Sequence, residues 1–351
     1  MGRIEIRDFD GDLEALSAMA HEAWLEAHGD ETWPDLYRPE LTQHLFADVE
    51  DPRLLIGAYD GARLVAFAAN LPRIYRFRGQ TYRGVFSCML VARKGYQGAA
   101  AYLFADGLRR NEAIDADFAL MTMEKNGRMW RAFEKHLKPR KRIQALTTIC
   151  PIFRVVDLER FAEAEDLSWY KAATVKLLGA HRPIAAPSVA GTVRPYRPSD
   201  LDGALALTER YPDQKGLVRV FDVEPLARQL HTEGITSTVV YERDGAVAGF
   251  VNFSAYPIVS NRGAHPHAWI DFLHWEGLTG GERKALLAGV WEASRSRGCI
   301  GILAWNTGYY ATGALFRSRF IPYPRFAELD LWILNPRLSL EGVEAVVEQL
   351  L

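Results

Sequence analysis

Hydrophobic and polar positions along the chain follow the same order of patterns twice. Alternating residues from Ile4 predict a strand, and apolar residues at helical spacing (Leu16, Ala20 and Trp24) follow it. From Thr192 the stretch Thr-Val-Arg-Pro-Tyr again predicts a strand, and a second helical pattern comes after it. Both halves of the chain are therefore expected to begin with a strand and a helix.

Each half also contains a β-hairpin signal. Residues 54–67 and 238–250 each hold two strand-like runs, joined by Asp60-Gly61 in the first case and Asp244-Gly245 in the second. Asp-Gly suits a tight hairpin turn because both central residues take positive φ. The two turns lie 184 positions apart (244 minus 60). The agreement in order and spacing predicts an internal duplication.

A segment with two prolines and several small residues, 181–190, is expected to join the two halves, because proline disfavours both a helix and a central strand. The predicted domains are residues 1–180 and 191–351. Each is of the mixed α/β class, with the order strand, helices, three strands, helix, strand, helix, strand. Further strands are predicted near 83–91, 118–123, 143–148, 269–274, 300–304 and 328–334, and further helices near 98–110, 127–137, 281–297 and 312–319.

Composition narrows the class of protein. The chain has 351 residues, with 42 Lys and Arg against 44 Asp and Glu, and this balance argues against a general nucleic-acid binder. No apolar run approaches the roughly 18 residues of a membrane helix, and the start has no apolar signal region, so a cytoplasmic protein is expected. Three widely spaced cysteines, Cys88, Cys150 and Cys299, predict neither a disulfide framework nor a metal cluster.

The segment from Leu90 to Ala100 places a short glycine-containing loop between a predicted strand and a predicted helix. The free amides and the dipole of such a helix start bind a diphosphate. Small residues let a phosphate approach the backbone, and two basic side chains add charge. The alternative is a simple strand-to-helix turn with two solvated basic residues. The candidate ligand-binding residues are Leu90, Val91, Arg93, Lys94, Tyr96, Gln97, Gly98, Ala99 and Ala100.

The element order and this loop resemble the GNAT acyltransferase superfamily. The superfamily pattern Arg/Gln-x-x-Gly-x-Gly/Ala aligns with Gly95-x-x-Gly98-x-Ala100, without the leading Arg or Gln. The resemblance implies two tandem GNAT-like domains, with acyl-CoA as co-substrate and no metal. In the second half, the segment after Trp275 lacks the glycine spacing, and Glu276 and Glu282 would repel a phosphate. The first half is therefore expected to bind the acyl donor, and the second to bind the acceptor or to be structural.

Within the superfamily the chain is most similar to protein N-myristoyltransferase. The stretches that carry the likeness are Arg128-Met-Trp-Arg131, Leu137-Lys-Pro-Arg-Lys-Arg-Ile143 and Thr238–Phe250 with Tyr256-Pro257. That family's Gly-Asp-Gly before its last strand is replaced here by Ile321-Pro-Tyr-Pro324, and its early acidic loop has no counterpart.

The resemblance implies three catalytic roles. Backbone N–H groups around Ser87 and Cys88, at a bulge in the fourth strand, would form an oxyanion hole. Asn126 would bind the incoming amine, or would simply cap the following helix. The terminal carboxylate of Leu351 would be the base, unless residues 340–351 form an ordinary amphipathic helix.

Candidate acceptor-binding residues lie on the second half. Asp271 and His274 are three apart, so in a regular strand they face opposite sides, and only a bulge or a strand end brings both to one pocket. Tyr256, Asn306 and Tyr309 are predicted at strand ends facing the same crevice. The alternative for each is a satisfied polar group of the core.

Together these features predict an N-acyltransferase that moves an acyl group from acyl-CoA, or from an acyl-carrier protein, to an amine by direct attack. The acceptor is a small molecule or a peptide, and no nucleic acid or membrane span is involved. Two alternatives stay open: a non-catalytic acyl-CoA-binding or sensing module, and an aminoacyl-tRNA-dependent transferase of the same fold. Phe133, where many superfamily members have a catalytic Tyr, favours the sensing module.

Overall fold

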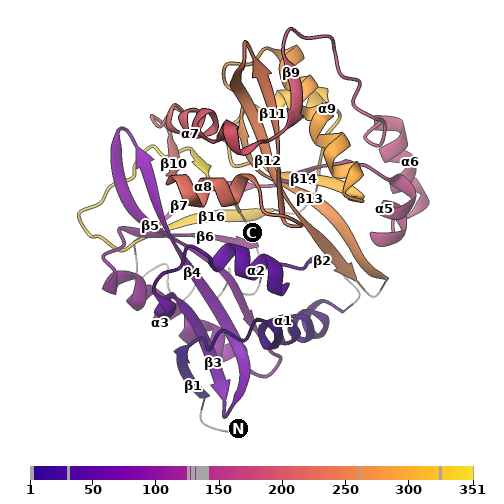
Figure 1. Ribbon diagram of the computed structural model, residues 1–351. Coiled ribbons are helices and arrows are strands. Elements are labelled where there is room, and N and C mark those ends of the chain that lie inside the picture. Colours follow the sequence, from indigo (N-terminus) through magenta and orange to yellow (C-terminus); the bar gives the residue numbers. More distant parts are fainter. Residues whose placement is uncertain are drawn as a thin grey trace. The chain divides into compact units, whose positions relative to one another are not determined.

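The computed structural model describes residues 4–29, 32–124, 127, 131, 142–260, 262–323 and 326–350. Contacts divide the chain into two compact units. The first consists of Met1–Thr148 and Phe326–Glu344, and the second of Ile149–Arg325 and Ala345–Leu350. Both units combine a mixed sheet with helices (Figure 1).

The first unit is built on one sheet. In spatial order its strands are β1 (Ile4–Asp8), β3 (Leu55–Asp60), β4 (Arg63–Phe77), β5 (Gln80–Ala92), β6 (Phe118–Glu124), β16 (Ala327–Ile333) and β7 (Arg142–Ile149). Its longer helices are α1 (Leu13–His28), α2 (Pro39–Phe46) and α3 (Gln97–Ala113), and short elements are η1 (Pro52–Leu54) and β2 (Trp33–Pro34). Ala99 and Leu103 of α3 pack on Ile56, Val65 and neighbouring core residues of β3 and β4, which fixes the start of this helix against the sheet.

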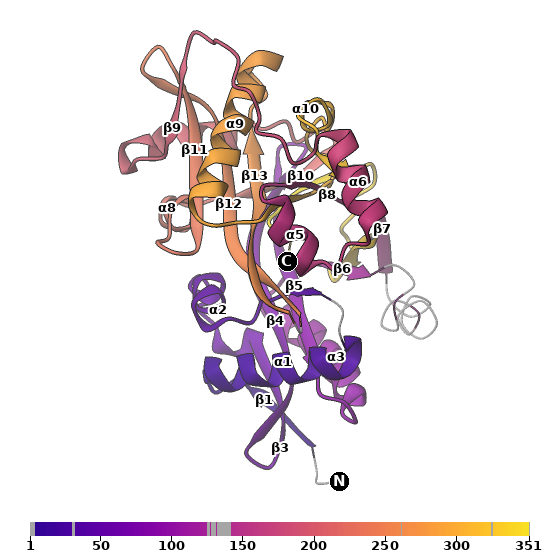
Figure 2. The ribbon, with the colours of Figure 1, turned by 90° about the vertical axis from the view of Figure 1, so that its right-hand side faces the viewer.

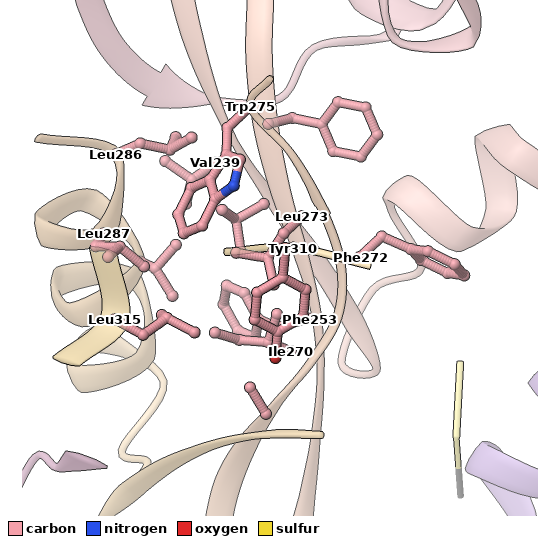
Figure 3. Close-up of a cluster of buried hydrophobic side chains, with 14 of the residues drawn as sticks. Val239, Phe253, Ile270, Phe272, Leu273, Trp275, Leu286, Leu287, Tyr310 and Leu315 are labelled. Carbon is pink, nitrogen blue, oxygen red and sulfur yellow. The ribbon is translucent and has the colours of Figure 1, made fainter. Parts of the chain in front are cut away.

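The second unit repeats this plan. Its sheet runs β15 (Ile321–Pro322), β8 (Pro151–Val155), β14 (Gly301–Trp305), β13 (Gly263–His274), β12 (Ala246–Ser260), β11 (Thr236–Arg243) and β9 (Thr192–Pro195), while β10 (Gly216–Val220) pairs in parallel with β17 (Ala345–Val347). The helical segments are α5 (Leu158–Ala164), α6 (Trp169–Leu178), η2 (Pro198–Asp200), α7 (Leu201–Glu209), α8 (Val223–Leu230), α9 (Gly280–Ser296) and α10 (Gly313–Arg317). Figure 3 shows the core between α9 and the sheet, where Leu286 and Leu287 lie near Val239 and Trp275.

Both predicted hairpins are present. Arg243 pairs with Ala246 across Asp244 and Gly245, as predicted. In the first hairpin Asp60 itself pairs with Arg63, so the turn consists of Gly61 and Ala62, one residue later than predicted, and Gly61 has φ 64°. Asp244 and Gly245 both have positive φ, at 54° and 77°. This is the backbone that favours Asp-Gly in two-residue hairpins.

Each unit takes a strand from the other half of the sequence. β8 follows β7 directly but pairs antiparallel with β14, and β16 comes from the end of the chain but pairs antiparallel with β6. The units are consequently discontinuous in sequence, unlike the predicted division at 181–190. The local pattern of hydrophobic residues locates a strand but does not specify which strand it pairs with. The exchange of β8 and β16 between the units could therefore not be predicted from the sequence.

The predicted amphipathic helix over residues 340–351 is wrong for the part that the structure describes. Ala345–Val347 form β17 instead, and Val343 and Ala345–Leu350 are buried. The spacing of Val343, Val346, Val347 and Leu350 fits one helix face, yet a short buried strand satisfies it equally, and adjacent valines favour a strand. The helix predicted over 127–137 lies largely outside the described residues.

The strand conformation of the tail makes a testable difference at Glu348. On a surface helix this residue would face solvent, but here it is only 3% exposed and accepts a hydrogen bond from Arg219 Nη1 at 2.9 Å. Breaking a buried ion pair costs about 3–5 kcal/mol, because the remaining charge keeps no partner. We expect Glu348→Ala to lower the free energy of unfolding by about that amount, measured by urea titration.

Glu341→Ala is the control on the same tail, since Glu341 is exposed. It should change stability by less than about 0.5 kcal/mol. Equal small effects of both substitutions would contradict the buried strand.

Candidate functional site

The first candidate feature is a bulge in β5. Across the β4–β5 ladder, Phe67 pairs with Val91 and Ala69 pairs with Cys88, so β5 contains one extra residue between those pairs. Met89 sits there with φ 56°, a left-handed conformation that is uncommon for a residue with a side chain. The bulge predicted for this strand is therefore present, directly after Ser87 and Cys88.

The sheet opens at the same point. β5 pairs in parallel with β6 only from Gly84 to Ser87, which face Phe118 to Met121. From Cys88 onward the β6 side of β5 has no strand partner in the described ladder. A cavity of about 20 Å³ lies at this opening, between β4, β5, β6 and α3, with Cys88, Phe104 and Met121 among its lining residues. Its volume is about that of one water molecule.

Three polar side chains lie beside this opening. Ser87 Oγ donates a hydrogen bond to Asn70 Oδ1 at 2.7 Å, and Asn111 Nδ2 donates to the same oxygen at 3.2 Å. All three residues are buried, and Asn111 Oδ1 has no hydrogen-bond partner within the described chain. The Ser87 hydroxyl is thus engaged in the scaffold, and only its backbone can serve the predicted oxyanion hole. Asn70 and Asn111 were missed from sequence, although an Asn inside an apolar strand was a signal.

β5 leads directly into the loop predicted to bind a diphosphate. Gly95 has φ 85°, and Tyr96 N donates to Arg93 O at 3.0 Å, which turns the chain sharply. α3 then begins at Gln97 with no side-chain cap and no acidic residue in its first turn. A Cβ added to Gly98 would meet no atom within 4 Å, so the space before the helix start is open. The first amides of α3 are consequently available to an anion.

The two basic residues of the loop are held by α1. Arg93 forms an ion pair with Glu22, and Lys94 N donates to Glu26 Oε2 at 3.1 Å. Burial lowers the pKa of Arg93. Tyr96 OH donates to Asp60 Oδ2 at 2.7 Å, and this bond raises the pKa of Tyr96. Arg93 therefore positions the loop, while the side chain of Lys94 is exposed.

α9, the counterpart of α3, has a different start. Thr279 Oγ1 accepts from Glu282 N at 3.3 Å, and Glu282 Oε2 accepts from Thr279 N at 2.7 Å. Tyr241 OH and Arg243 Nη1 donate to the other oxygen of Glu282 at 2.9 and 3.0 Å. These bonds, first of all the one from Thr279 N, lower the pKa of Glu282 to about 2. The helix start of the second unit is therefore occupied by its own carboxylate.

The second unit also repeats the bulge and the opening. Asn252 pairs with Phe272 and Phe253 with Ile270, so Asp271 is the extra residue of β13. β13 pairs with β14 only as far as Ile270. Beyond that point Leu273 N donates to Tyr309 OH at 2.9 Å. Tyr309 therefore closes this opening of the second unit.

Asp271 lies at the centre of a buried polar network. Its carboxylate accepts from Ser254 Oγ at 2.6 Å and from Gln229 Nε2 at 3.2 Å, and Gln229 also donates to Asn252 Oδ1 at 2.8 Å. Gln349 of the tail donates to Ser254 Oγ at 3.3 Å. Burial raises the pKa of Asp271 to about 7 despite these donors. The network members other than Asp271 were not predicted, although Asn252 and Ser254 alternate on one face of an apolar strand.

His274 is buried on the same strand, and neither ring nitrogen has a hydrogen-bond partner among the described residues. Its ring packs against Phe250 at 4.8 Å and Tyr211 at 5.8 Å between centroids. Burial lowers the pKa of His274 to about 3. The bulge at Asp271 removes the alternation that would separate Asp271 from His274, and the ring of Tyr211 contacts both His274 and Tyr309.

Of the remaining acceptor candidates, Asn306 lies at a strand end as predicted, and Tyr256 does not. Tyr256 lies inside β12 rather than at its end and stacks on Trp269 at 5.0 Å. Asn306 follows β14, and its backbone N donates to Cys150 O at 3.2 Å. Asn126 and Leu351 lie outside the described residues.

A larger hollow, of about 640 Å³, lies elsewhere in the second unit. It is bounded by α5, α6 and the end of α9, with Arg160, Lys176 and Cys299 among its lining residues. None of the predicted site residues lines it. The described residues include no group of three or more His, Cys, Asp or Glu arranged to hold a metal ion. Among the described helices, none combines the length and apolarity that crossing a membrane requires.

Solved structures with the same fold place this geometry in context. N-myristoyltransferase from Saccharomyces cerevisiae was solved with bound myristoyl-CoA. Its structural similarity to this protein covers 100% of this chain and 85% of the yeast chain, with a TM-score of 0.77 and 16% sequence identity. A GCN5-related N-acetyltransferase from Anabaena variabilis ATCC 29413 matches 95% of this chain and 73% of its own, with a TM-score of 0.53 and 12% identity. No protein-family model and no curated protein matches the sequence. The predicted mixed α/β fold, a tandem GNAT-like arrangement similar to N-myristoyltransferase, is confirmed.

The cap of α9 gives a prediction with a defined pH dependence. Because the pKa of Glu282 is lowered in the folded state, its contribution is complete above the ordinary value of 4.5 and is lost as the pH falls towards 2. We expect Glu282→Gln to lower the free energy of unfolding by about 1–2 kcal/mol at pH 7. Below pH 4.5 the difference from the wild type should shrink, as measured by urea titration.

Glu292→Gln is the control on the exposed face of α9, where Glu292 pairs with Arg295. It should be nearly neutral at every pH. A Glu282→Gln effect that stayed constant down to pH 2 would show that the carboxylate is not the cap.

Proposed function

We propose that the chain is an N-acyltransferase that binds acyl-CoA in its first unit and transfers the acyl group to an amine. One observation carries this proposal: the opened, bulged edge of β5 leads directly into the uncapped start of α3. The bulge would bring backbone N–H groups of β5 towards the carbonyl of a thioester, and the uncapped helix start would bind the diphosphate of the same ligand.

The diphosphate end of CoA would bind at the start of α3. The amides of Gln97 and Gly98 and the positive end of the helix dipole face an anion there. Gly98 leaves room for close approach, and exposed Lys94 adds positive charge. The corresponding position in the second unit is filled by Glu282, which supports donor binding in the first unit alone.

The thioester would lie at the β5 bulge, where the backbone N–H groups around Ser87 and Cys88 can donate to its carbonyl oxygen. In the reaction the amine nitrogen forms a bond to the carbonyl carbon, and the carbon–sulfur bond breaks. The sulfur leaves with the electron pair, and the amine loses a proton to a base. Donors aimed at the developing oxyanion contribute about 10²–10³ in rate each.

The acceptor would be an amine, on a small molecule or a peptide, bound with the help of the second unit. Asp271, His274 and Tyr309 are the candidate contacts of that unit, because the bulge of β13 places Asp271 next to its opening. An acyl-carrier protein is an alternative source of the acyl group.

The helix start can be tested with matched glycine substitutions. Gly98→Ala adds a methyl group where the structure is open, so folding is retained, but the methyl would occupy the path of a phosphate. We expect at least tenfold weaker CoA binding by calorimetry, and no measurable binding for Gly98→Asp, whose charge opposes phosphate.

Gly281→Ala is the matched control, since Gly281 is likewise the second residue of its helix, α9, and an added Cβ there makes only an ordinary contact of 3.8 Å with Val189. It should bind CoA as the wild type does. Absence of CoA binding by the wild type, or equal loss in both variants, would refute donor binding at α3. Binding without turnover on any amine would instead support a sensing module.

The same proposal assigns the base to the terminal carboxylate of Leu351. It is supported by the tail before it, in which Glu348 is held by Arg219 and Gln349 by Ser254. Adding one glycine after Leu351 would displace the carboxylate and leave these contacts in place. We expect kcat to fall at least about 100-fold, with CoA affinity unchanged, while a glycine added before Met1 has no effect. Unchanged turnover in the extended protein would exclude this base.

A further inference from the structure

Helix α6 presents its largest apolar side chains to solvent. Trp169 is 82% exposed, Tyr170 56% and Leu177 87%. Of the ten residues of α6, Val175 alone is buried. Burying such side chains would normally stabilise the fold, so their exposure points to a surface that covers them outside this chain.

The exposed side chains form one stripe. Trp169, Ala173 and Leu177 are separated by four residues each, so they follow one another along a single face, and Tyr170 lies beside them. Val175 points to the opposite side, towards the protein. An ordinary surface helix turns its apolar stripe inward, whereas α6 has the reverse orientation. Figures 1 and 2 both show α6 beside α5 at the margin of the second unit.

The helix that carries this stripe is itself basic, although exposed Asp166 lies three residues before Trp169. Between residues 168 and 182 the chain carries Lys171, Lys176 and Arg182 and no Asp or Glu, although the whole protein has a net charge of -2. Lys171 and Lys176 are both exposed. The partner that covers α6 should therefore have an apolar interior for the exposed side chains and negative charge at its surface for the lysines.

We propose that α6 binds peripherally to a membrane surface that contains anionic phospholipid. Trp169, Tyr170 and Leu177 enter the boundary between headgroups and acyl chains, where aromatic rings with a polar edge are favoured. Lys176, three residues after Ala173 at the edge of the stripe, lies against lipid phosphates, while Lys171 shares the side of Val175 and adds positive charge from there. The helix axis lies in the plane of the surface, and nothing spans the bilayer.

A second copy of the chain fits this surface less well. A helix of ten residues is about 15 Å long, so its face falls far short of the roughly 800 Å² per partner that a stable dimer buries. A symmetric contact would also place Lys176 of one copy near the same residue of the other. A membrane needs no large matching protein surface and places no lysines opposite lysines. The free energy of shallow insertion of a few side chains adds to the electrostatic attraction of many lipid charges.

Vesicle flotation tests the proposal with the full-length protein. We expect binding to vesicles of phosphatidylcholine mixed with phosphatidylglycerol, much weaker binding to phosphatidylcholine alone, and weakening by salt. The double variant Trp169→Ala/Leu177→Ala should lose at least tenfold in partitioning. Lys176→Glu should lose at least about fivefold, in keeping with the contribution of one basic residue near an anionic surface.

Matched control variants distinguish binding through α6 from nonspecific adsorption to vesicles. Val223→Ala removes an apolar side chain that is 51% exposed on α8, and Arg337→Glu reverses an exposed charge in the first unit. Both should partition like the wild type, and all variants should keep the wild-type melting temperature.

Three results would overturn the proposal: failure of the wild type to bind anionic vesicles, equal binding by the α6 variants, or sedimentation of the wild type as a dimer that Trp169→Ala/Leu177→Ala dissociates. None of these results depends on CoA binding, so this test and the test of the proposed function can fail independently.

Discussion

The free amides at the start of a helix need a partner, and the two units of this protein meet that need in opposite ways. In α9 the carboxylate of Glu282 folds back on Thr279 N and gathers Tyr241 and Arg243 around it. In α3 the Gln97 side chain accepts from Gly95 N at 2.9 Å, but Tyr96 at the N-cap makes no side-chain cap bond to the helix, and Gly98 leaves space beside its first turn. Two copies of one plan therefore differ at the helix start, because one acidic residue, Glu282, caps α9 and has no counterpart in the first turn of α3.

The same asymmetry recurs one element earlier. Both units carry a bulge in the strand before the helix, and in both the parallel neighbour strand separates at that point. In the second unit Tyr309 OH takes up the Leu273 amide that the separation leaves free. The first unit instead places the Asn70, Ser87 and Asn111 side chains beside a cavity of about 20 Å³. The two openings are thus filled differently, by a tyrosine hydroxyl in the second unit and by a small cavity with polar side chains beside it in the first.

Short-range chemistry made part of this structure predictable. The glycines of the two Asp-Gly pairs located both hairpins: Asp244 and Gly245 both accept positive φ, whereas in the first turn Gly61 does so and Ala62 follows it. The loop around Gly95 and Gly98 was visible as glycines between a strand and a helix. The partners of β8 and β16 were not, because strand pairing across more than a hundred residues leaves no local trace. The tail was misassigned because four apolar positions in eight residues fit a helix face and a buried strand alike.

The polar residues of the core were also not predicted from the sequence. Arg219, Gln229, Ser254 and Gln349 each look like ordinary surface residues in sequence, and only the fold brings them to Asp271 and Glu348. Their mutual hydrogen bonds are what make burial tolerable. From the sequence, a bulge was considered only as the condition under which Asp271 and His274 could share a pocket. The pairing of β12 with β13 shows that Asp271 is the bulged residue.

The place of β16 in the first sheet has a consequence for how the protein is made. During synthesis β6 emerges some two hundred residues before Ala327–Ile333, the strand that pairs with its free edge. Until the ribosome has delivered Ala327–Ile333, that edge is exposed to pairing with other nascent polypeptides. The early half must therefore wait as an incomplete sheet, and protection by chaperones would be needed most during elongation rather than after release.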